Sequence, residues 1–187
     1  MICWNSTSKI CRKLSRQVAV VKRMRNILPF EIRKNIYFSF VVQHFDYCAQ
    51  TWHYCNRSSA EKLEKVNERA VRFAFWHKHT TYEELLKLLG RGTLMEQRLS
   101  KILWSVFKLV NNKSNPESLN ELIALRETTC ALRGKDTLKV SKVNTTRFGL
   151  NSWRYQAPKI WNNFPDVVRA SPDLKTFKTL LENDSLF

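Results

Sequence analysis

The chain has 187 residues, of which 43% are hydrophobic and 26% charged; this is enough to bury a core and untypical of a disordered or low-complexity chain. No apolar run approaches the ~18 residues of a membrane-spanning helix, so we expect no membrane partner. Lys and Arg number 32 against 16 Asp and Glu, a net charge of +16 that attracts polyanions and makes nucleic acid the leading partner class.

The N-terminus and the cysteines bear on the compartment. Residues 1–13 are mostly polar and basic, which is not the order of a secretory signal peptide. The five cysteines are odd in number and scattered along the chain, which favours reduced thiols over a disulfide framework. We therefore expect an intracellular chain, with nucleus and cytoplasm both left open.

The first predicted element is an amphipathic helix over residues 8–28, ended by Pro29. Apolar side chains recur on one side of it at helical spacing: Ile10, Leu14, Val18, Val21 and Leu28. Another side carries a basic stripe, made of Lys9, Arg12, Lys13, Arg16 and Arg23. Residues 1–30 hold seven basic residues and no acidic one.

This basic stripe is the candidate nucleic-acid-binding site. Five cations along one helix can follow a phosphate backbone, and Trp4 nearby could stack on a base or sugar. The alternative is that the stripe is only the solvated face of a surface helix. The absence of any acid over thirty residues favours the binding interpretation.

Four more helices are predicted before residue 112. The first runs from Pro29 to about Phe45, with a buried face of Ile32, Ile36, Phe40 and Val41. The other three begin at pairs with the capping-box spacing: Ser58 with Glu61, Thr80 with Glu83, and Thr93 with Glu96. Their expected apolar stripes include Leu63, Val66, Ala70, Phe73 and His77 in the first, and Met95, Leu99, Ile102, Val106 and Val110 in the last.

The C-terminal part is expected to be less regular. A helix is predicted to open near Ser114, and an extended or hairpin segment is predicted near residues 137–150. Short helices follow at 157–164 and from Ser171 to about Leu181. The fold class is thus mainly α, with about seven helices. A linker would divide the chain into a helical region, 1–112, and a smaller region, 113–187, unless the two form one continuous domain.

The sequence offers no catalytic site and no convincing metal site. It has no acidic pair of the kind that two-metal enzymes use, no Gly-rich phosphate loop and no hydrolase motif, so we assign no catalytic residue and no cofactor. Zinc could be bound by side chains of the types found at His44, Cys48, His53 and Cys55, but their spacing matches no zinc motif, and an aromatic cluster is the better interpretation. The aromatic residues Trp153, Tyr155 and Trp161 are expected in a core.

Several ordered motifs point to one family. Residues 28–29, 37–41 and 44–47, with Trp52 beyond, are followed by the helix 63–72 of sequence LEKVNERAVR. Near the C-terminus come GLNSWRY, APKIWNNFP, and a final Leu174 with Phe177 and Lys178. This series resembles the region that follows the polymerase core in reverse transcriptases of non-LTR (LINE-type, jockey-like) retrotransposons. Asn67 replaces the Gln that is usual in the family's helix motif.

The resemblance covers nearly the whole chain and implies a thumb-like helical region without its palm. The family's catalytic aspartates lie upstream in the palm, and no Asp-Asp pair occurs here, so the implied function is a non-catalytic fragment of an RNA-directed DNA polymerase. It would bind template-primer or element RNA, and the palm of a parent enzyme where that is present. Two alternatives stay open: a degenerate product without activity, and a helical interaction module that docks an acidic protein.

Overall fold

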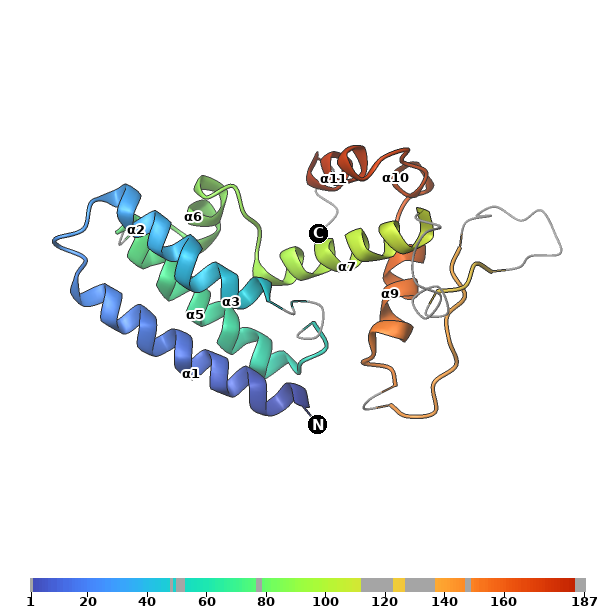
Figure 1. Ribbon diagram of the computed structural model, residues 1–187, viewed down its shortest axis with the longest axis horizontal. Coiled ribbons are helices and arrows are strands. Elements are labelled where there is room, and N and C mark those ends of the chain that lie inside the picture. Colours follow the sequence, from blue (N-terminus) through green and yellow to red (C-terminus); the bar gives the residue numbers. More distant parts are fainter. Residues whose placement is uncertain are drawn as a thin grey trace. The chain divides into compact units, whose positions relative to one another are not determined.

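The computed structural model describes residues 2–47, 49, 53–76, 79–111, 123–126, 137–146 and 149–183. The regular elements in these ranges are helices, with a single isolated β-bridge, which confirms the mainly α fold class. The chain divides into two compact units, Met1–Arg98 and Leu99–Phe187 (Figure 1). This division falls inside helix α7, whose first turn belongs to the first unit, whereas the sequence suggested a division after residue 112.

Helix α1, Ile2–Arg23, is the basic amphipathic helix expected from the sequence. It begins six residues before the predicted start, and its end at Arg23 precedes a hydrogen-bonded turn that leads to Pro29. In that turn the backbone N–H of Leu28 donates to the carbonyl of Met24 at 3.2 Å. Leu14 and Val18 are buried as the apolar stripe predicts, because this side of α1 packs on helix α5.

The next helical stretch is continuous but changes its winding. It consists of α2, Phe30–Ile36, the π-helix η1, Tyr37–Val42, and α3, Gln43–Asp46. The predicted buried face is wrong at Ile32 and Phe40, which are 45% and 56% exposed. At Phe40 the cause is the π-helix, because i→i+5 bonding widens the turn and rotates the side chains away from the predicted 3.6-residue period. Ile32 precedes η1, on α2, where no residue is buried. Val41 is buried as predicted, and the other buried side chains are Tyr37, Val42 and Phe45.

Helix α5, Arg57–Phe75, is the central helix of the first unit and contacts α1, α2, η1 and α6. Its predicted stripe is confirmed, since Leu63, Val66, Ala70 and Phe73 are buried; His77 lies outside the described residues. The predicted cap is wrong. Asn56 is the N-cap, and its side chain accepts from the N–H of Ser59 at 3.1 Å. Glu61 pairs with Arg57 at 3.0 Å instead of closing a capping box with Ser58.

Helices α6, Tyr82–Leu88, and α7, Leu94–Asn111, start with capping boxes. For α6 the box is Thr81 with Glu84, one residue later than predicted. For α7 the predicted pair Thr93 with Glu96 is confirmed by reciprocal bonds of 2.8 and 3.3 Å. Between them Gly90 adopts a φ of +64°, and the N–H of the next residue closes the helix end on the carbonyl of Leu86.

A buried polar chain crosses the first unit. The Tyr37 hydroxyl donates to Asn67 Oδ1 at 3.0 Å, and Asn67 Nδ2 donates to the Tyr82 hydroxyl at 2.8 Å. Tyr82 in turn donates to Glu64 Oε1 at 2.5 Å, and Glu64 also accepts from the backbone N–H of Leu94. The chain therefore links η1, α5, α6 and the start of α7. Burial is the main cause that raises the pKa of Tyr37 to about 12.

The second unit is built around three aromatic residues. It contains the rest of α7 with α9, Trp153–Asn162, α10, Asp166–Arg169, and α11, Leu174–Asn183. Phe107 stacks on Phe177 with centroids 4.5 Å apart, and Trp161 lies 5.8 Å from Phe177. Trp161 is buried as predicted, whereas Trp153 and Tyr155 are only partly buried.

An extended segment over residues 137–146 packs on α9. Leu138 forms an antiparallel bridge with Leu125, and both backbone groups of Leu138 bond to the side chain of Asn162, at 2.8 and 2.9 Å. An asparagine thus serves the extended chain as a neighbouring strand would. The helix predicted to open near Ser114 lies outside the described residues.

Candidate nucleic-acid interface

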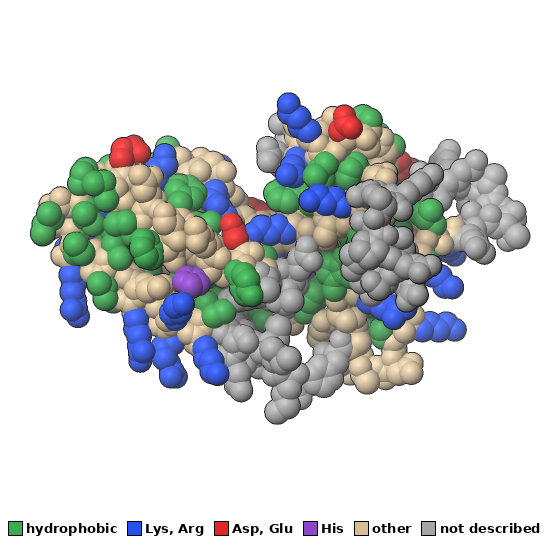
Figure 2. Space-filling model, in the orientation of Figure 1, with side chains coloured by type: hydrophobic (Ala, Val, Ile, Leu, Met, Phe, Trp, Pro, Cys, Tyr) green, Lys and Arg blue, Asp and Glu red, His purple; other side chains and the backbone are tan. Residues whose placement is uncertain are grey.

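The structure places the predicted basic stripe on one helix, and all of its members are exposed. They are Lys9, Arg12, Lys13, Arg16 and Arg23, all on α1. Figure 2 shows Lys and Arg side chains gathered along the edge of the first unit that α1 forms. The side chain of Trp4, the predicted stacking partner, lies outside the described ones. Five cations are therefore exposed along a helix of 22 residues, an arrangement that suits contacts to a phosphate backbone.

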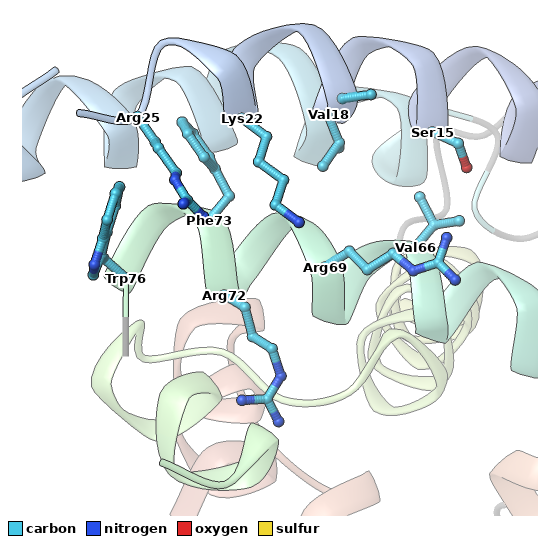
Figure 3. A pocket seen from close by; sticks show the side chains of 10 residues that line it. Ser15, Val18, Lys22, Arg25, Val66, Arg69, Arg72, Phe73 and Trp76 are labelled. Atoms are coloured by element: carbon cyan, nitrogen blue, oxygen red, sulfur yellow. The ribbon is translucent and has the colours of Figure 1, made fainter. Parts of the chain in front are cut away.

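A groove runs beside this stripe, between α1 and α5. It has a volume of about 660 Å³. Buried Val18, Val66 and Phe73 contribute apolar side chains to its lining. The groove's basic side chains come from two elements far apart in sequence, and Figure 3 shows them around it: Lys22, Arg25, Arg69 and Arg72. None of the residues that line it is acidic.

The groove and the stripe are parts of one surface. Successive residues of an α-helix are rotated by about 100°, so Lys22, Ser15 and Ala19, which line the groove, lie beside Arg12 and Arg23 around α1. The charge is not cancelled along the groove, because Lys22 and Arg69 form no ion pair with a residue in the described ranges. A polyanion bound along the stripe of α1 would therefore lie next to the opening of the groove.

Two of the groove's arginines have structural partners. Arg72 donates to Glu68 at 2.9 Å and to the carbonyl of Thr80 at 3.0 Å, which joins α5 to the segment before α6. Arg25 stacks on the indole of Trp76, with its guanidinium carbon 4.4 Å from the ring centroid. Arg33 lies 5.4 Å from the same ring. Lys22 and Arg69 are therefore the side chains best placed to receive a ligand.

Trp76 ends α5 in a strained backbone conformation. Its φ of 58° and ψ of 19° lie in the left-handed region, and among the described residues it is the one non-glycine with positive φ. A bulky side chain is rare there, and glycine is the usual occupant at the end of a helix. Even so, the indole stays 39% exposed at the end of the groove. The backbone thus holds a large aromatic ring at a site where glycine would be less strained.

The surroundings of His44 carry the same positive field. Partial burial, followed by the charge of Lys13, lowers the pKa of this histidine. The lowered pKa favours the neutral form of His44 over the charged one.

The side chains of the types that bind metal ions do not assemble into a metal site within the described part of the chain. No three of its His, Cys, Asp and Glu residues are placed to hold a metal ion; Cys48, one of the residues considered for zinc, lies outside it. Burial, followed by Arg98, lowers the pKa of His53 to about 4. Burial also raises the pKa of the Cys11 thiol, which makes it a poor nucleophile.

Sequence reasoning missed the groove. Lys22 is one of the seven basic residues before residue 30 but lies off the stripe, and the sequence assigns no binding role to Arg69 or Arg72. The one available signal was the density of arginines in the helix 63–72. The left-handed backbone at Trp76 leaves no such signal in a short stretch of sequence.

Comparisons of the chain with protein-family models, with curated proteins and with solved structures found no match. No helix in the described ranges is long and apolar enough to cross a membrane.

Proposed function

We propose that this chain binds nucleic acid without sequence selectivity, through the basic stripe of α1. The observation that carries the proposal is the row of five exposed cations on one helix, in a stretch of thirty residues that has no acid. Contacts to phosphates position a protein on nucleic acid but read no bases, and the stripe offers few groups other than ammonium and guanidinium.

An RNA/DNA hybrid is the ligand that the proposal favours. An RNA-containing duplex has a wide, shallow minor groove edged by phosphates and 2′-hydroxyls, which is recognised by shape. The order of motifs from residue 28 to residue 178 supports this ligand through its resemblance to the region after the polymerase core of non-LTR reverse transcriptases. The proposed role is that of a thumb-like fragment that holds template-primer or element RNA without catalysis of its own.

The test is binding of the full chain to a labelled blunt RNA/DNA hybrid, measured by fluorescence anisotropy. The double variant Arg12→Glu/Arg16→Glu reverses two charges of the stripe. Its control is Lys87→Glu/Lys175→Glu, which reverses two exposed charges on α6 and α11. We expect the stripe variant to lose about tenfold or more in affinity relative to the control. Equal losses in the two variants would refute the proposal, because net charge alone would then explain the binding.

A further inference from the structure

We infer that the groove between α1 and α5 is a binding site for a single strand of RNA or DNA, with Trp76 as the platform on which a base stacks. This inference rests on the proposed function and adds to it a second site and a second form of nucleic acid. The stripe would hold a duplex through its phosphates, and the groove would take unpaired nucleotides continuous with that duplex.

The charge of the groove favours an anionic strand. Basic residues line it on both walls, with Lys22 and Arg25 on the α1 side and Arg69 and Arg72 on α5, although Arg72 points away from α1 toward its partners Glu68 and Thr80 (Figure 3). No acidic residue lines the groove to oppose them. Lys22 and Arg69 have no ion pair within the described ranges, so a phosphate need not displace an existing partner to reach them.

The shape of the groove favours one strand over two. The groove lies between packed helices, and the axes of such helices are about 8–10 Å apart, so a duplex cannot enter it. Its volume of about 660 Å³ is that of an ordinary ligand pocket, and the partly exposed Trp76 at its end offers a ring on which an unpaired base can stack. A duplex has its bases already stacked and would gain nothing from such a surface.

Trp76 supplies the feature that distinguishes a nucleic-acid strand from an acidic peptide. Its partly exposed indole lies against the planar guanidinium of Arg25 at the end of the groove (Figure 3). Indole and guanidinium planes are the surfaces on which unpaired bases stack, whatever the sequence. An acidic peptide would use the cations but has no need of the ring. The strained backbone at Trp76 is explained if the ring is there to receive a base.

The experiment compares two probes on the full chain: a labelled single-stranded oligouridine of about twelve nucleotides, and a blunt RNA/DNA hybrid of equal length. Two groove variants are used, Lys22→Glu/Arg69→Glu and Trp76→Gly. Glycine suits the left-handed backbone, so Trp76→Gly removes the ring while relieving the strain, and its fold is checked by circular dichroism. The stripe variant Arg12→Glu/Arg16→Glu is measured beside them.

We expect both groove variants to weaken binding of oligouridine by about fivefold or more, with Lys22→Glu/Arg69→Glu compared with the charge control Lys87→Glu/Lys175→Glu. Trp76→Gly, which changes no charge, should change binding of the hybrid by less than about threefold. Trp76→Gly should leave the salt dependence of oligouridine binding unchanged, because stacking releases no counterions. Lys22→Glu/Arg69→Glu should reduce the slope of log affinity against log salt by roughly 1 to 2.

The possible failures separate the two proposals. If oligouridine binds the groove variants as tightly as the wild type while the stripe variant loses the hybrid, the groove inference is wrong and the proposed function stands. If the stripe variant keeps the hybrid, the proposed function fails. If a polyaspartate peptide of equal charge displaces oligouridine and also binds Trp76→Gly unchanged, the groove is a site for acidic protein segments, and the inference is overturned.

Discussion

The change of Asn67 to leucine tests the polar chain that joins the helices of the first unit. Asn67 is fully buried and lies between two tyrosines, accepting from Tyr37 and donating to Tyr82. Leucine fills a similar space but leaves the buried Tyr37 hydroxyl without an acceptor. Because the pKa of Tyr37 is raised to about 12, the hydroxyl stays protonated in the variant. It therefore remains a hydrogen-bond donor that needs an acceptor. A buried polar group left without a partner costs about 1–3 kcal/mol, and we expect the free energy of unfolding to fall by that amount.

The double variant Tyr37→Phe/Asn67→Leu separates this cost from loss of packing. With both partners apolar, no donor is left without an acceptor at this position. The double variant should therefore lose about 1 kcal/mol less unfolding free energy than the losses of the two single variants added together. The assay is urea unfolding followed by far-UV circular dichroism, with unchanged slopes and shifted midpoints. Strictly additive single changes, or an Asn67→Leu cost below about 0.5 kcal/mol, would refute the reasoning.

Three further predictions concern stability. Trp76→Gly should unfold at a higher urea midpoint than Trp76→Ala, because left-handed backbone costs a residue with a β-carbon about 1–2 kcal/mol; equal midpoints contradict the proposed strain. His53 has a pKa of about 4 in the folded chain against an ordinary value near 6.5, so the unfolded chain takes up the proton first as the pH falls. The wild type should therefore lose stability between about pH 6.5 and pH 4. His53→Gln should lose less stability than the wild type between pH 7 and pH 5, and equal losses would contradict this. Phe177→Ala should destabilise the second unit by about 3–5 kcal/mol in thermal unfolding, and a loss under about 1 kcal/mol would show that the aromatic cluster is not its core.

The parts of the fold that follow from local sequence were predictable. The spacing of Leu14 and Val18 on α1, and of Leu63, Val66 and Ala70 on α5, identified faces that the structure buries. Those faces are set by the 3.6-residue period, which needs no knowledge of distant contacts. The five cations of the stripe were predictable for the same reason, since the same 3.6-residue period places them on the exposed side of the helix.

The errors arise where neighbouring residues compete or where packing overrides the period. Asn56 and Ser58 are both residue types that cap helices, and it is Asn56 whose side chain accepts from the N–H of Ser59. At Phe40 the π-helical turn moved the buried face away from that of a regular α-helix. The groove could not be predicted because its two walls are some fifty residues apart in the chain and meet only through the packing of α1 on α5.

The most direct test of the account is the salt dependence of hybrid binding by the full chain, wild type beside Arg12→Glu/Arg16→Glu. If the stripe contacts four to five phosphates, log affinity should fall against log salt with a slope of roughly −4, and the stripe variant should show a slope shallower by about 2. Parallel slopes for the two proteins, or weak binding with no dependence on salt, would contradict the claim that α1 holds a phosphate backbone.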